Sequence, residues 1–97
     1  MIISLSAGKH ELLERNDYGR LSLRAPSGWS SAEIEGGLPF KVECTTDHIW
    51  IKESDLRVLA QIPATASDPI SGMLEKARKY GFYNDATGTV RVHIEYY

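Results

Sequence analysis

Apolar and polar residues alternate along the last nine residues of the chain, TVRVHIEYY (89–97). Alternate side chains of an extended strand point to opposite faces, so this pattern predicts a half-buried strand. One face would carry Val90, Val92, Ile94 and Tyr96, and the other Arg91, His93, Glu95 and Tyr97. We expect the aliphatic face to pack against the core and the titratable face to meet solvent.

Similar patterns, separated by Gly, Asn, Asp and Pro, predict further strands upstream. We expect them at 2–6, 10–15, 20–25, 39–45, 48–52 and 56–63. The turn residues at 16–19 are predicted to join the second and third of these strands as an antiparallel hairpin. A turn at Thr46–Asp47 would place Cys44 opposite Ile49. Segment 56–63 is apolar on both faces, which is typical of a central strand or of one covered by a helix.

The clearest periodic segment is a helix at about 69–80. Asp68 suits the N-cap and Pro69 the first helical position, while Gly81 suits a left-handed C-terminal cap. One stripe at the i, i+3, i+4, i+7 spacing is apolar, and it consists of Ile70, Met73, Leu74 and Ala77. We expect this stripe to pack against the face of the last strand that carries Val90.

Residues 30–37 allow two interpretations. Ser30 followed by Glu33 forms the pattern of a capping box, which would open one helical turn before Gly36 and Gly37 end it. An extended loop fits the same residues.

These elements predict an α+β fold. Most strands follow one another with short connections, which favours antiparallel pairing. We therefore expect a mostly antiparallel, curved sheet of six to seven strands with the helix at 69–80 on one face. The absence of internal repeats and of linker-like segments predicts a single globular domain over 1–97.

Composition narrows the class of protein. The chain has 97 residues, of which 42% are hydrophobic and 25% charged, as in ordinary globular proteins. The formal net charge of -2 and the absence of a basic run argue against nucleic-acid binding as a function. There is no signal-peptide pattern and no apolar segment of membrane-spanning length, so we expect a cytoplasmic protein without membrane contact.

The sequence lacks the motifs of several kinds of catalytic and metal site. Cys44 and His48 are four residues apart, but the predicted hairpin turns them to opposite faces, so we expect no metal site. Cys44 alternates with Phe40 and Val42, which predicts a small core residue rather than a nucleophile. No GxSxG, GxxxxGK[ST] or GxGxxG sequence is present, and we expect no cofactor.

The polar face of the last strand allows one catalytic hypothesis. Arg91 would hold a phosphate while His93 and Glu95 transfer protons, with His48 as a second imidazole. That set would suit a small acid–base hydrolase or ribonuclease. The alternative is a solvated strand face whose charged residues form only weak cross-strand pairs.

A binding surface is the hypothesis we favour from the sequence. If Ile49 and Ile51 face the core, the alternate side chains of the same strand point outward, and these are His48, Trp50 and Lys52. An outward tryptophan is typical of a binding hot spot. Together with Arg91, His93 and Tyr97 they would contact a protein partner or a second copy of the chain, and Tyr96 and Trp29 would add to the patch. The alternative is that residues 26–37 or the helix cover Trp50 within the same molecule. A terminal strand at a sheet edge would also offer its backbone for pairing.

The sequence thus predicts a small non-enzymatic interaction protein of the accessory, inhibitor or immunity type. A small hydrolase that uses Arg91, His93 and Glu95 is the alternative. Partner, substrate and pathway leave no signature in these residues.

Overall fold

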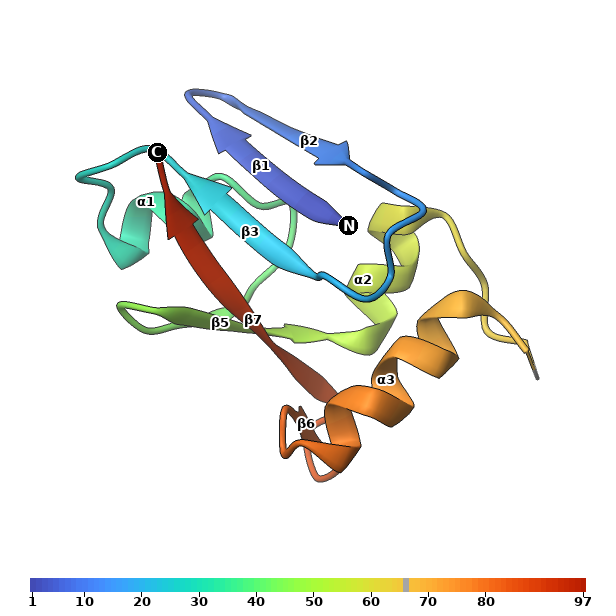
Figure 1. Ribbon diagram of the computed structural model, residues 1–97. Coiled ribbons are helices and arrows are strands. Elements are labelled where there is room, and N and C mark those ends of the chain that lie inside the picture. The colour runs from blue at the N-terminus through green and yellow to red at the C-terminus, as the bar shows by residue number, and fades with distance from the viewer. Residues whose placement is uncertain (66) are drawn as a thin grey trace.

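The fold is α+β, as the sequence predicts. The computed structural model describes residues 1–65 and 67–97, which form seven strands and three helices (Figure 1). In chain order they are β1 (Ile2–Ser6), β2 (Lys9–Leu13), β3 (Ser22–Ala25), α1 (Ser31–Gly36), β4 (Glu43–Cys44), β5 (His48–Lys52), α2 (Glu53–Ala60), α3 (Pro69–Lys79), β6 (Tyr83–Asn84) and β7 (Thr89–Tyr96).

The sheet is mixed rather than mostly antiparallel. Its order is β2-β1-β3-β7-β5-β4, and β6 pairs with the beginning of β7. The β1/β3 and β3/β7 pairs are parallel, whereas the other pairs are antiparallel. The last strand does not lie at a sheet edge, because β7 lies between β5 on one side and β3 and β6 on the other (Figure 1).

The predicted hairpin between 10–15 and 20–25 does not form. Instead β2 folds back on β1 through a two-residue turn at Ala7–Gly8, with Ser6 opposite Lys9 and Gly8 at φ 71°. Glycine reaches this left-handed conformation without steric cost, and such turns are the usual short hairpin connections. Because β2 occupies one edge of β1, the chain returns along 14–21 and adds β3 to the other edge in the parallel direction.

The turn at Thr46–Asp47 forms as predicted. Cys44 lies opposite Ile49, and the backbone N–H of Thr45 donates to the carbonyl of His48 at 2.8 Å. The strand that precedes this turn is shorter than expected, because only Glu43–Cys44 of the predicted 39–45 pairs with β5.

Residues 56–60 belong to α2, so the prediction of a strand at 56–63 is wrong. Leu56 and Ala60 are buried and Leu59 is half-buried, and this i, i+3, i+4 spacing is one face of a helix. The side chain of Arg57 lies 2.9 Å from that of Glu53, one turn earlier. The predicted turn at 53–55 is therefore the first turn of α2.

The predicted helix at about 69–80 is confirmed as α3. The side chain of Asp68 accepts a hydrogen bond from the Ser71 N–H at 2.9 Å at the start of α3. At its end Phe82 N–H donates to Ala77 C=O at 2.7 Å and Gly81 N–H to Arg78 C=O at 3.2 Å, the pattern of a Schellman cap. The 30–37 segment takes the helical alternative, with a reciprocal capping box at the start of α1.

All three helices contribute to one hydrophobic core on one side of the sheet. The buried side chains of the strands, such as Ile49, Val92 and Ile94, join Ile34 of α1, Leu56 of α2 and further buried residues of α3 in a single cluster. Apart from the buried Ile2, the side chains that alternate with these strand residues are half-buried or exposed, and we call their side the outer face. It carries Ser4, Ser22, Arg24, His48, Trp50, Lys52, Arg91, His93 and Glu95.

Candidate functional site

The strands β5 and β7 place most of the predicted binding residues next to one another on the outer face. His48 lies opposite His93 and Trp50 opposite Arg91, with Lys52 opposite Thr89 at the end of the pair. Between these pairs Ile49 and Ile51 point the other way and are 0% exposed. Strand alternation therefore explains why the chemistry-bearing side chains gather on one surface.

The two imidazoles form a cross-strand pair. The ring centroids of His48 and His93 lie 5.8 Å apart in an edge-to-face arrangement. The backbone of His48 is fixed by Thr45, whose hydroxyl accepts from its N–H at 3.2 Å and lies 3.1 Å from its carbonyl oxygen. The turn at Thr46–Asp47 thus holds the imidazole of His48 beside the central strand.

Arg91 is held by an aromatic side chain rather than by a carboxylate. Its guanidinium carbon lies 4.2 Å from the ring centroid of Phe82, a cation–π distance. Its backbone N–H donates to the carbonyl of the same Phe82 at 2.7 Å. The side chain of Arg91 is half-buried, so part of its guanidinium side chain remains exposed.

Trp50 is half-buried on the outer face. It lines a hollow of about 530 Å³ together with residues 41–43, Lys52 and the β6–β7 connection. From the sequence, residues 26–37 or the helix could have covered Trp50. None of the described residues that line this hollow belongs to 26–37 or to a helix. One side of the indole therefore borders an open hollow.

Glu95, the carboxylate of the acid–base hypothesis, lies beside an arginine of β3. Glu95 lies 3.8 Å from the guanidinium of Arg24, and both side chains are about half exposed. Glu95 and His93 also line a pocket of about 310 Å³, to which Arg20, Arg24 and Glu14 contribute. An exposed ion pair of this kind contributes at most about 1 kcal/mol to stability. Glu95 remains accessible because its side chain is 52% exposed.

Tyr97 is separated from the Trp50 region. Its hydroxyl donates to the carbonyl of Leu5 in β1, and its backbone N–H donates to Ala25 in β3. It therefore lies on the β3 side of β7, whereas Trp50 lies on the β5 side. Tyr96 donates its hydroxyl to the carbonyl of Thr46 at 2.8 Å and is 41% exposed.

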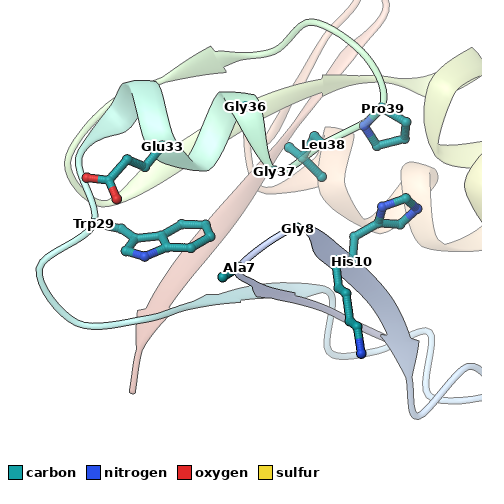
Figure 2. A pocket seen from close by; sticks show the side chains of 10 residues that line it. Ala7, Gly8, His10, Trp29, Glu33, Gly36, Gly37, Leu38 and Pro39 are labelled. Carbon is teal, nitrogen blue, oxygen red and sulfur yellow. The ribbon is translucent and has the colours of Figure 1, made fainter.

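A pocket that the sequence did not indicate lies between the β1–β2 turn and α1 (Figure 2). It measures about 430 Å³, with Trp29 beneath α1 and His10 near Pro39 at the other end. A Cβ atom at Gly37 would lie 3.4 Å from both Trp29 and Leu5, so glycine allows the end of α1 to pack closely here. The Glu33 carboxylate in this pocket already accepts from Ser30 in the capping box. These residues come from distant segments, and no spacing in the sequence relates them.

The surroundings of Cys44 and of the described His, Asp and Glu side chains bear on covalent and metal chemistry. Burial raises the pKa of the Cys44 thiol, so it is protonated at neutral pH and a weak nucleophile. Across 1–65 and 67–97, no group of three or more His, Cys, Asp or Glu side chains is placed to hold a metal ion. In the same residues no helix has the length and apolarity to cross a bilayer.

The chain was compared with protein-family models, with curated proteins and with solved structures, and none of them matches it. A function for the chain is therefore proposed below from the contacts, exposure and charges of its residues.

Proposed function

We propose that the protein is a small non-enzymatic interaction module, of the accessory, inhibitor or immunity type, which presents the outer face to a protein partner. The observation that carries this proposal is the one-sided burial of β5 and β7. Ile49, Ile51 and Val92 are fully buried under the helices, whereas Trp50 and Arg91 lie opposite each other on the face that the described helices leave open.

The chemistry of this face supports contact with a protein. Tryptophan and arginine are the residues most enriched among binding hot spots, and both are fixed here by strand pairing before any partner arrives. Lys52 beside them and the Arg24–Glu95 pair farther along would form a polar rim. The face therefore has the centre and the border of a typical interface.

A strand edge offers a weaker surface for the same purpose. β7 is paired on both sides, so the edges of the described sheet belong to β2 and to the two-residue strands β4 and β6. Exposed Lys9, His10 and Glu11 lie on β2. Charged side chains on an edge strand disfavour pairing with another chain. We therefore assign the interaction to the outer face.

Trp50→Ala should abolish or strongly weaken partner binding while the protein stays folded. The half-buried indole contributes about 2 kcal/mol of burial, which a domain of ordinary stability tolerates. The measurement is capture from the source cell followed by binding of the purified partner, with thermal unfolding of each variant. Val58→Ala is the matched control, because Val58 is 78% exposed on α2 and away from the outer face.

A partner that binds wild type and Val58→Ala but not Trp50→Ala supports the proposal. Sizing of the purified protein extends the test to a second copy, which would appear as a concentration-dependent dimer lost in Trp50→Ala. The proposal is wrong if Trp50→Ala lowers the melting temperature by many degrees and leaves binding unchanged.

A small acid–base hydrolase is the second candidate, and the adjacent imidazoles of His48 and His93 favour it. In that case His93→Ala would abolish activity on RNA, phosphodiesters or esters without lowering stability. Wild-type protein inactive on all three substrate classes would remove this candidate.

A further inference from the structure

A groove lies beside the outer face, between the last turns of α3 and the loop that precedes β3. Its volume is about 350 Å³, and its aromatic and cationic lining consists of Tyr18, Tyr80, Phe82, Arg20, Lys76 and Arg91. The groove follows from the sheet topology. β6 and β3 both pair with the same side of β7. β6 pairs with Thr89 and Val90, and β3 begins its pairing at His93, so a gap between the two strands lies beside Arg91.

The aromatic wall of the groove is rigid and exposed. Phe82 is fixed by two backbone hydrogen bonds, one to Ala77 in the cap of α3 and one from Arg91 in β7. Its ring centroid lies 6.2 Å from that of Tyr80. Phe82 is 38% exposed and Tyr80 69%, although large aromatic side chains gain free energy when they are buried. Exposed aromatic residues that lie side by side mark contact surfaces.

The charges of the groove all have one sign. The ion pairs among the described residues involve Arg24, Arg57 and Arg78. The groove cations Arg20, Lys76 and Arg91 take part in none of them, and no carboxylate lines the groove. The chain as a whole has 13 acidic and 11 basic residues, so this concentration of positive charge is local.

We propose that the groove binds an acidic segment of the protein partner, with one apolar side chain of that segment against Tyr80 and Phe82. The carboxylates beside that side chain pair with Arg20, Lys76 and Arg91. The volume suits one or two side chains rather than a folded element. Because Arg91 belongs to both surfaces, the groove extends the outer face, and this inference deepens the proposed function by naming the chemistry of the partner.

The test is selection from a random twelve-residue peptide library displayed on phage, with the full-length protein as bait. We expect enriched peptides to carry at least two Asp or Glu residues next to an aromatic or aliphatic residue. A synthetic peptide of this sequence should bind more weakly as salt rises, because its charges lie near solvent. Absence of enrichment, or enriched peptides with no acidic bias, would overturn the proposal.

Matched charge reversals locate the binding site. Lys76→Glu should weaken the synthetic peptide about tenfold, and Arg20→Glu/Lys76→Glu further. Lys79→Glu makes the same change of charge on the same helix outside the groove lining, and it should weaken binding by less than about threefold. Equal losses for Lys76→Glu and Lys79→Glu would show a general charge effect and overturn the groove as the site.

The two proposals fail separately. A partner that is lost in Trp50→Ala but kept in Arg20→Glu/Lys76→Glu would leave the outer face as the interface and overturn the groove. A partner that still binds Trp50→Ala but no longer binds Arg20→Glu/Lys76→Glu would support the groove and overturn the outer face as the interface. If the selected peptides match an acidic segment of this chain and the purified protein dimerises, the occupant is a second copy, and the proposal of a separate partner is wrong.

Discussion

Asp68 is the charged residue that the fold buries most completely within the described chain, at 8% exposure. Its carboxylate accepts from the Thr65 N–H at 2.9 Å and from both the N–H and the hydroxyl of Ser71. It also lies 2.9 Å from the guanidinium of Arg57, which binds Glu53 in turn. The buried charge is therefore fully partnered, and it joins α2 to the start of α3.

These hydrogen bonds set the pH dependence of stability. They and Arg57 hold the pKa of Asp68 well below its ordinary value of 3.8. As pH falls below about 4, the unfolded chain binds a proton that the folded protein binds only at lower pH. The stabilisation that Asp68 provides is thus complete at neutral pH and is lost progressively in acid.

Asp68→Asn should remove this acid dependence. Asparagine is also a good N-cap, so the variant mainly removes the negative charge opposite Arg57. We expect its melting temperature at pH 7 to fall by roughly 5–10 °C, and its decline between pH 5 and 2 to be flatter than that of the wild type. Thermal unfolding followed by circular dichroism across this range checks both effects. Parallel pH curves for the two proteins would contradict the role of the carboxylate.

At the scale of the element, α3 contains within its own segment the residues that determine where the helix begins, which face it buries and where it ends. The cap, the apolar stripe and the terminal glycine all lie within 68–81, and the structure uses each of them. Gly81 has a φ of 78°, which side-chain-bearing residues adopt only with strain. Gly72 lies in the same helix, and a Cβ atom there would meet nothing within 4 Å.

The same substitution at these two glycines should have opposite effects. Gly81→Ala is expected to lower the free energy of unfolding by about 1 kcal/mol, because alanine is strained in the left-handed cap. Gly72→Ala should raise it by about 0.5–1 kcal/mol, because alanine loses less backbone entropy in a helix. Urea unfolding of the two variants beside the wild type measures both. A rise for Gly81→Ala would contradict the left-handed cap, and a fall for Gly72→Ala would contradict the open helical position of Gly72.

The misassigned helix α2 shows the limit of local patterns. A run of apolar residues such as LRVLA fits both a strand buried on two faces and a helix with one buried stripe. The signals that favour the helix are the acidic Glu53 and Asp55 in its first turn and the i, i+4 pair of Glu53 with Arg57. The sequence of these residues also fits a turn, because turns and helix starts use the same residue types.

At the scale of the molecule, the sheet order depends on contacts that no segment carries alone. Ser22 lies beside His93 in a parallel pair, although the two residues are far apart in the sequence. The alternation in β5 and β7 was enough to predict which side chains share the outer face. It was not enough to predict the groove, whose walls come from three separate parts of the chain.

The sheet order predicts where the backbone opens least readily. β7 has partners on both sides, and Val92 and Ile94 on it are buried. We therefore expect the amides of these two residues to exchange with deuterium at least about a hundredfold more slowly than those of the edge strand β2. Amide exchange measured by nuclear magnetic resonance checks this. Equal protection of β2 and β7 would contradict the central position of β7.

The two tryptophans lie in different settings. Trp29 packs against the core near the end of α1, whereas Trp50 borders a hollow on the outer face. Their fluorescence consequently reports two separate events. A Trp29→Phe variant keeps Trp50 as an optical sensor of whatever molecule covers the open side, and a Trp50→Phe variant keeps Trp29 as a sensor of unfolding.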